Sequence, residues 1–143
     1  MIMRPPKKRV LLADDHPELL QDIQQLLARD FEIVGTASDG LTLIQMAEAL
    51  KPDVVVTDIR MPKLSGIDAA RTILQQKTCT AIVLLTVHND IRLVRSALDA
   101  GIRGYVLKAT AGEDLIAAIE RTLGGGVFVS QYVNHPPSEG KGV

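Results

Sequence analysis

The segment Val54–Asp58, with the sequence VVVTD, is an apolar run that ends in a carboxylate. A short, continuous apolar run of this kind is typical of a central parallel strand that is buried on both faces. Ile59–Pro62 and then Ser65-Gly66 follow it, so the chain turns sharply after Asp58. Because the loops at the carboxyl ends of parallel strands converge on one crevice, we expect Asp58 to lie where such loops meet.

Three other apolar runs end in the same manner, each in a polar or charged residue. These runs and the residues that end or follow them are Val10–Ala13 with Asp14 and Asp15, Ala81–Leu85 with Thr86, and Gly104–Leu107 with Lys108. If all four strands are parallel neighbours, their ends share one crevice. Three carboxylates, a hydroxyl and an ammonium in that crevice would suit a divalent cation and a phosphoryl group.

Amphipathic stretches separate these strands and predict helices. Apolar residues recur at helical spacing over residues 19–27, 41–50, 67–74, 91–98 and 115–123, and Phe31–Ala37 is a weaker strand. Ser65–Asp68 and Thr110–Glu113 have the pattern of capping boxes that open helices. The alternation of strand and helix with short connections predicts a three-layer α/β domain with right-handed crossovers.

Composition limits the classes of protein that remain. The chain has 143 residues and a formal net charge of −1, which suits one domain and gives no general attraction to nucleic acid or anionic lipid. Cys79 is the only cysteine, so no intrachain disulfide can form. No apolar run approaches the roughly 18–20 residues of a membrane span, and the basic segment Met1–Arg9 lacks the apolar core of a signal peptide. We therefore expect a cytoplasmic protein without membrane contact.

Four longer motifs accompany the strand ends. They are LLADDHP at 11–17, TDIRMPKLSGID at 57–68, LLTVH at 84–88 and AGIRGYVLKA at 100–109. In this order, they resemble the receiver domain of two-component response regulators, over about residues 8–124. The residues of these motifs are most similar to those of the NarL/FixJ (LuxR-type) subfamily, whose members usually carry a C-terminal helix-turn-helix that binds DNA.

The resemblance implies a specific architecture. The expected fold is a doubly wound, five-stranded parallel sheet in the flavodoxin-like order 2-1-3-4-5, with five helices. Residues 1–8 would be a lead-in, residues 9–125 the receiver domain, and residues 126–143 a tail or the start of a linker to an output domain. Val127–Val129 has the composition to pair or pack briefly.

The resemblance also assigns the phosphoryl and metal chemistry. Asp58 would be the phosphoacceptor that takes a phosphoryl group from a sensor histidine kinase. Mg²⁺ would be held by Asp15, Asp58 and the main-chain carbonyl of Arg60, with Asp14 acting mostly through a bound water. Such a protein would catalyse its own phosphorylation and autodephosphorylation while serving mainly as a switch.

A second set of residues would convert phosphorylation into a change of shape. Lys108 would neutralise phosphoryl oxygens, and Thr86 would donate a hydrogen bond to one of them. Tyr105 occupies the position of the family's switch aromatic, which moves into the space behind Thr86. The readout surface would be the fourth helix, the last strand and the fifth helix, and the receiver would form a homodimer on phosphorylation.

Other positions at the site rim depart from, or vary within, the family pattern. Arg60 and His88 flank the phosphoacceptor at positions that influence autodephosphorylation in the family, and His16 lies where a kinase partner would dock. Val87 follows Thr86 where many receivers have a smaller residue. Ala109 follows Lys108 where many have a proline in a cis peptide, so the geometry of that bond does not follow from the resemblance.

Several alternatives stay open at this point. A phosphatase of the haloacid dehalogenase class would need an aspartate where Arg60 stands, and a nucleotide-binding enzyme would need a glycine-rich phosphate loop. A phosphorylation-independent protein-binding module and a stand-alone receiver remain alternatives. The residues after Gly126 are too few for a helix-turn-helix with its supporting helices. DNA binding is therefore expected only through an output domain that this chain does not contain.

Overall fold

The strands form one parallel sheet in the order β2-β1-β3-β4-β5-β6 in the computed structural model, which describes residues 6–131. The strands are β1 (Lys8–Ala13), β2 (Phe31–Ala37), β3 (Val54–Thr57), β4 (Ala81–Thr86), β5 (Gly104–Leu107) and β6 (Phe128–Val129). The helices are α1 (Pro17–Leu27), α2 (Gly40–Leu50), α3 (Gly66–Gln76), α4 (Ile91–Asp99) and α5 (Ala111–Leu123), with a 3-10 turn at Lys108–Thr110. The predicted order 2-1-3-4-5 and the five helices are confirmed, and β6 extends the sheet by one strand.

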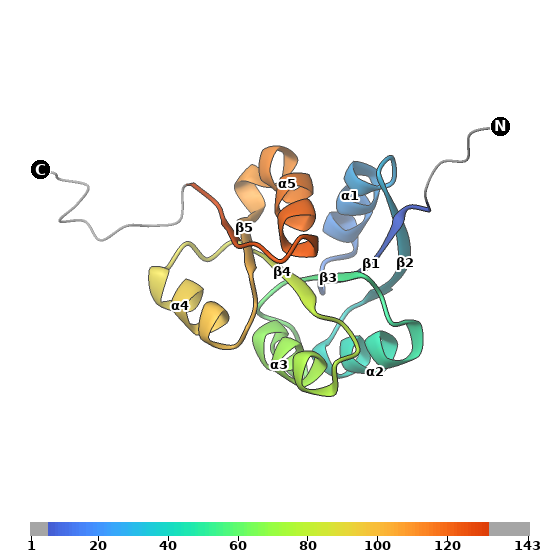
Figure 1. The fold of residues 1–143 in the computed structure, drawn as a ribbon, viewed down its shortest axis with the longest axis horizontal. Helices are drawn as coiled ribbons and strands as arrows, with labels where there is room; N and C mark the ends of the chain where they lie inside the picture. Colours follow the sequence, from blue (N-terminus) through green and yellow to red (C-terminus); the bar gives the residue numbers. More distant parts are fainter. Residues whose placement is uncertain (1–5, 132–143) are drawn as a thin grey trace, which may run out of the picture.

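Helices cover both faces of the sheet. Figure 1 shows α1 and α5 on one side and α2, α3 and α4 on the other. Alternate residues of each central strand enter the two cores: Val55 faces α2–α4, whereas Val54 and Val56 face α1 and α5. Because both faces are covered, the strand needs apolar side chains at every position.

Side chains cap the N-termini of α2, α3 and α4, whereas α1 and α5 begin without a side-chain cap. The Ser65 hydroxyl accepts a hydrogen bond from the Asp68 N–H at 3.1 Å, so the predicted cap of α3 is confirmed. Thr110 directly precedes α5, but its hydroxyl makes no hydrogen bond with the helix N–H groups. It donates instead to the Asp114 carboxylate at 2.8 Å. The prediction of a Thr110 side-chain cap is therefore wrong, because a carboxylate one turn along the helix competes for the hydroxyl.

Strand β6 covers the edge of β5, where the sequence suggested at most a brief contact. Phe128 and Ser130 donate backbone hydrogen bonds to the carbonyls of Arg103 and Tyr105, each at 2.9 Å. Phe128 packs against the core beneath α1 and α5, and Val129 packs against the core on the other face. The expected readout surface of α4, β5 and α5 thus includes β6 along the edge of β5. The expected domain boundary after residue 125 stays a prediction.

Within residues 6–131, no helix is both long enough and apolar enough to cross a membrane.

Candidate functional site

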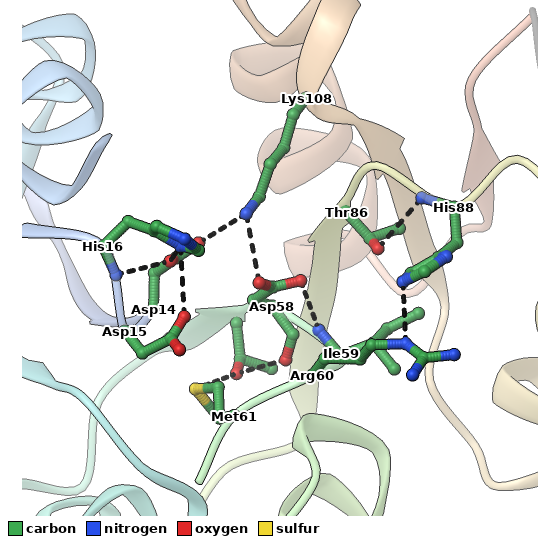
Figure 2. Close-up of polar contacts among 11 residues, drawn as sticks. Asp14, Asp15, His16, Asp58, Ile59, Arg60, Met61, Thr86, His88 and Lys108 are labelled. Carbon is green, nitrogen blue, oxygen red and sulfur yellow. Dashed lines mark hydrogen bonds and ion pairs between the residues drawn. The ribbon is translucent and has the colours of Figure 1, made fainter. Parts of the chain in front are cut away.

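The carboxyl ends of β1, β3 and β5 bring three charged side chains into contact. The Lys108 ammonium lies 2.8 Å from Asp14 Oδ2 and 3.0 Å from Asp58 Oδ2. Figure 2 shows Lys108 reaching down between the two carboxylates. Asp14 is 4% exposed and Asp58 is 6% exposed, so both carboxylates are largely withdrawn from water. Residues 14, 58 and 108 therefore meet in space, as convergence of parallel strand ends requires.

The Lys108 ammonium is stabilised in its charged form. Burial alone would lower its pKa, because a charged group loses solvation when it leaves water. The hydrogen bonds and negative charges of Asp14 and Asp58 outweigh burial and raise the pKa of Lys108 above its usual value. The lysine therefore stays protonated and offsets the repulsion between the two carboxylates.

The loop after Asp58 packs too tightly for any residue but glycine at position 66. A Cβ atom on Gly66 would lie 1.7 Å from the carbonyl oxygen of Asp58. The Gly66 N–H donates to the Ile59 carbonyl at 2.6 Å, and the Ile59 N–H donates to Asp58 Oδ1 at 2.7 Å. These contacts fix the Asp58 carboxylate. This role of Gly66 does not follow from the 57–68 motif, where the only signal is a glycine directly after the cap residue Ser65.

A cluster of metal-ligating groups surrounds the Asp58 carboxylate. One ligand atom from each of Asp14, Asp15, His16 and Asp58 lies within 4.8 Å of the others. Carboxylate oxygens are the ligands that hard divalent cations prefer. The three aspartates therefore fit such a cation, with Asp15 on the more open side of the cluster.

The His16 ring lies at the rim of this cluster. Its Nδ1 atom is 2.9 Å from Asp14 Oδ1 and 3.1 Å from Asp15 Oδ1. The hydrogen bond that the His16 ring donates to Asp14, followed by the charge of Asp15, raises the pKa of His16. His16 also borders a surface hollow with Pro17, Leu19 and Val87. The predicted position at the site rim agrees with this placement, whereas kinase docking at His16 stays a prediction.

Thr86 lies on the other side of the site, at the end of β4. It is fully buried, and its hydroxyl oxygen accepts a hydrogen bond from the His88 N–H at 3.2 Å. Its sequence position predicted a hydrogen bond to a phosphoryl oxygen. Because the hydroxyl only accepts in its bond with His88, its own proton is still available for such a bond.

Two more side chains hold the same loop at His88. The buried Tyr105 hydroxyl donates to the His88 carbonyl at 2.6 Å. Burial, with a smaller contribution from the charge of Asp90, raises the pKa of Tyr105 to about 12. Arg60 Nε donates to His88 Nε2 at 3.0 Å near the surface. Val87 lies between the two anchored residues and is 69% exposed.

The Lys108–Ala109 peptide bond is trans. Ala109 itself is exposed, so the turn that carries Lys108 gains no packing from this side chain.

Comparison with known proteins identifies the family that shares this arrangement. Residues 10–120 match the family described as response regulator receiver domain. The transcriptional regulatory protein MctR of Rhizobium johnstonii is 36% identical over 130 residues, which cover 90% of this chain and 61% of MctR. The nitrate/nitrite response regulator protein NarL of Escherichia coli K12 is 36% identical over 124 residues, which cover 85% of this chain and 57% of NarL. The chain thus spans a little over half the length of these curated relatives.

Solved structures give the same result. A two-component response regulator of the LuxR family from Aurantimonas sp. SI85-9A1 superposes with a TM-score of 0.84 at 28% identity, covering 96% of this chain and 99% of that one. The isolated receiver domain of RcsB from Salmonella enterica serovar Typhimurium, in the presence of the phosphomimetic BeF3−, superposes with a TM-score of 0.80 at 31% identity. That match covers 89% of this chain and 96% of the RcsB chain. The predicted NarL/FixJ resemblance is therefore confirmed.

Proposed function

The chain belongs to the response regulator receiver family, of the NarL/FixJ (LuxR-type) kind, and from that premise we propose that Asp58 accepts a phosphoryl group in a Mg²⁺-dependent reaction. The observation that carries this proposal is the contact of Lys108 with both Asp14 and Asp58 at the carboxyl ends of β5, β1 and β3. Phosphoryl transfer depends on positioning and on charge neutralisation more than on covalent assistance. A buried carboxylate beside an ammonium and a cluster of further carboxylates meets both needs.

The acidic cluster at the strand ends would hold the cation. Asp15, Asp58 and the main-chain carbonyl of Arg60 would hold Mg²⁺, with Asp14 acting through a bound water. When bound, Mg²⁺ would neutralise negative charge on the phosphoryl oxygens. The Asp58 side chain is already oriented by the Ile59 N–H, so it needs no reorganisation before reaction.

The transfer step then follows from the residues of the chain itself. A carboxylate oxygen of Asp58 forms a bond to phosphorus while the phosphorus–nitrogen bond of a kinase phosphohistidine breaks, and the imidazole leaves. Lys108 neutralises charge on the transferred group, and the Thr86 hydroxyl donates a hydrogen bond to one of its oxygens. Arg60 and His88, which are hydrogen-bonded to each other at the outer rim, would influence the rate at which the aspartyl phosphate is later hydrolysed.

The wider role extends beyond this chain. Receiver domains of this family take phosphoryl groups from sensor histidine kinases, and the relative MctR is a transcriptional regulatory protein by name. We propose that the chain works with such a kinase and controls transcription through a C-terminal DNA-binding domain of a longer protein. Phosphorylation would promote a homodimer. This chain alone should give no sequence-specific shift in a DNA-binding assay, and a specific shift would refute that division of roles.

Intact-mass measurement tests the proposed chemistry. Wild type and Asp58→Asn are incubated with acetyl phosphate and Mg²⁺, and a parallel sample contains EDTA. We expect one phosphoryl adduct on wild type with Mg²⁺, lost in alkali, and none on Asp58→Asn or with EDTA, since a carboxamide lacks the nucleophilic carboxylate oxygen. Both proteins should give the same far-ultraviolet circular dichroism spectrum. An adduct of equal yield on Asp58→Asn would contradict the assignment, and no adduct on wild type would favour the binding-module alternative.

A further inference from the structure

The backbone directly before Lys108 is held by a residue from the C-terminal end of the described chain. Leu107 is the last residue of β5, and its N–H donates to the hydroxyl of Ser130 at 3.0 Å. Strand β6 pairs with β5 only through Phe128 and Val129. The Ser130 side chain therefore takes the place of the backbone acceptor that a longer strand would supply to Leu107.

The same hydroxyl connects to the far end of the lysine turn. Ser130 Oγ donates to Asp114 Oδ2 at 2.9 Å, and Thr110 Oγ1 donates to the same oxygen at 2.8 Å. Leu107 precedes the 3-10 turn Lys108–Thr110, and Thr110 ends it. Both ends of the turn are thus joined through one carboxylate in the first turns of α5.

Burial makes this connection costly to break. Ser130 is 2% exposed, and Leu107 is buried as well. If the Ser130 hydroxyl were removed, the Leu107 N–H would be left without a partner in a buried place, which protein backbones rarely tolerate. The turn would relax until water or another group reached the Leu107 N–H, and the Lys108 backbone would move with it.

Side chains of the lysine turn itself add little to its packing. Ala109 is exposed, and Thr110 does not cap α5. The Lys108 side chain is nevertheless only 14% exposed and reaches two carboxylates at hydrogen-bond distance. Besides the pairing of Leu107 with β4 and the Ala111 N–H bond to the Lys108 carbonyl, the contacts that hold the turn are the hydroxyls of Ser130 and Thr110 and their shared acceptor, Asp114.

We propose that Ser130 is a positioning residue for Lys108, acting through the Leu107 N–H and, with Thr110, through Asp114. This inference rests on the proposed function, because it assigns a role to the lysine of that site. Ser130 lies outside the family match at residues 10–120, so the segment after α5 becomes part of the working site. A hydroxyl from this segment keeps the lysine where charge develops on the transferred group.

The test measures labelling by acetyl phosphate across a range of donor concentrations at saturating Mg²⁺. Ser130→Ala and Thr110→Val should each lower the maximal rate about three- to tenfold, because a displaced lysine neutralises the transferred group less well. The donor concentration at half-maximal rate and the Mg²⁺ affinity from calorimetry should change less than about twofold, because Asp14, Asp15 and Asp58 are untouched. Thr110→Ser keeps the hydroxyl and should restore the rate.

Matched controls separate the hydroxyl from the general packing of this region. Val129→Ala shortens a neighbouring β6 side chain without touching the Ser130 hydroxyl, and Thr72→Val removes an exposed helix hydroxyl on α3. Both should label at close to the wild-type rate. A loss in Val129→Ala equal to that in Ser130→Ala would assign the effect to packing of β6 and overturn the proposal.

A double-mutant cycle with Lys108 gives the sharpest outcome. If Ser130 acts through Lys108, Ser130→Ala should cause no further loss of labelling in a Lys108→Ala background. A full additional loss in that background, or a wild-type rate for Ser130→Ala alone, would refute the positioning role. Failure of wild type itself to label would instead refute the proposed function, so the two failures are distinguishable.

Discussion

The two sides of the site differ in how completely they are assembled. On one side, which we call the anionic half, Asp14, Asp15, Asp58 and Lys108 lie at strand ends, and the lysine contacts two of the three carboxylates. On the other side, the switch loop Thr86–His88 directs its threonine hydroxyl to its own backbone. The side chains of the proposed phosphorylation site are therefore fixed by the packed strands of the sheet, whereas the proposed switch is held only by hydrogen bonds of a loop.

The contacts explain this difference. The anionic half is fixed by parallel strands whose side chains fill both cores, and packed cores have few alternative arrangements. The switch loop is held at His88 by Thr86, Tyr105 and Arg60. Loss of any one of these hydrogen bonds costs about 1 kcal/mol, so a new charge near Thr86 is sufficient to rearrange them.

The largest expected effect comes from removing the cation of the anionic half. Lys108→Ala should lower the rate of phosphorylation by acetyl phosphate roughly 100-fold, because a preorganised charge at the transferred group is lost. Some labelling should remain, but the amide signals of Thr86–His88 in NMR spectra should no longer shift on phosphorylation. Lys63→Ala, which removes an exposed lysine near Asp39, is the matched control. Equal losses of phosphorylation rate in the two variants would contradict the role assigned to Lys108.

Binding of Mg²⁺ at the anionic half should stabilise the whole fold against unfolding. At a Mg²⁺ concentration 100 times its dissociation constant, the free energy of unfolding should rise by roughly 2.7 kcal/mol. Differential scanning calorimetry with and without EDTA measures this rise. Asp15→Asn should reduce it, whereas Asp22→Asn on the exposed side of α1 should not. The same rise in Asp15→Asn as in wild type would place the cation elsewhere.

Thr86→Val should separate the two halves. The isosteric change removes the hydroxyl, so labelling should slow about fivefold, as expected for one lost hydrogen bond. Stabilisation by Mg²⁺ should be unchanged, and Thr86→Ser should label like wild type. If Thr86→Val abolished Mg²⁺ stabilisation, the two halves would not be independent.

The smallest expected effect concerns Tyr105 at high pH. Burial holds the pKa of Tyr105 at about 12 in the folded chain, above its ordinary value of 10. The protonated hydroxyl therefore stabilises the fold fully below pH 10, and this contribution is lost as the pH rises from 10 through 12. Tyr105→Phe should cost about 1 kcal/mol near neutral pH, where the bond to the His88 carbonyl is intact. Urea unfolding should show that difference falling across pH 10–12, and a constant difference would contradict it.

The sequence predicted the anionic half because the pattern there is repetitive. Each buried strand needs a continuous apolar run, so the first charged residue after Val10–Ala13 or Val54–Thr57 marks a strand end. Parallel order then places Asp14 and Asp58 side by side without further information. The cap residue Ser65 could likewise be predicted from its neighbours in the sequence.

The remainder depended on contacts between distant segments or on competition between hydrogen-bond partners. Strand β6 has two residues, too short for an alternating pattern to identify, and its pairing requires the exposed edge of β5. Thr110 stands at a position typical of a helix cap. Its hydroxyl nevertheless donates a hydrogen bond to Asp114, which also accepts one from the Ser130 hydroxyl. The partner of the Thr86 hydroxyl likewise depends on the path of its loop. Competition between hydrogen-bond partners of similar strength is not encoded in local sequence.

The most direct test of the contrast between the two halves is a crystal structure with Mg²⁺ and beryllofluoride. We expect beryllofluoride on the Asp58 carboxylate, with Lys108 Nζ at hydrogen-bond distance from a fluorine and Asp14 and Asp15 unmoved. The Thr86 hydroxyl should donate a hydrogen bond to a fluorine, and the loop Thr86–His88 should have moved. Beryllofluoride on Asp58 with the loop Thr86–His88 unmoved and no hydrogen bond from Thr86, or no beryllofluoride on Asp58 at all, would contradict a fixed anionic half coupled to a movable switch loop.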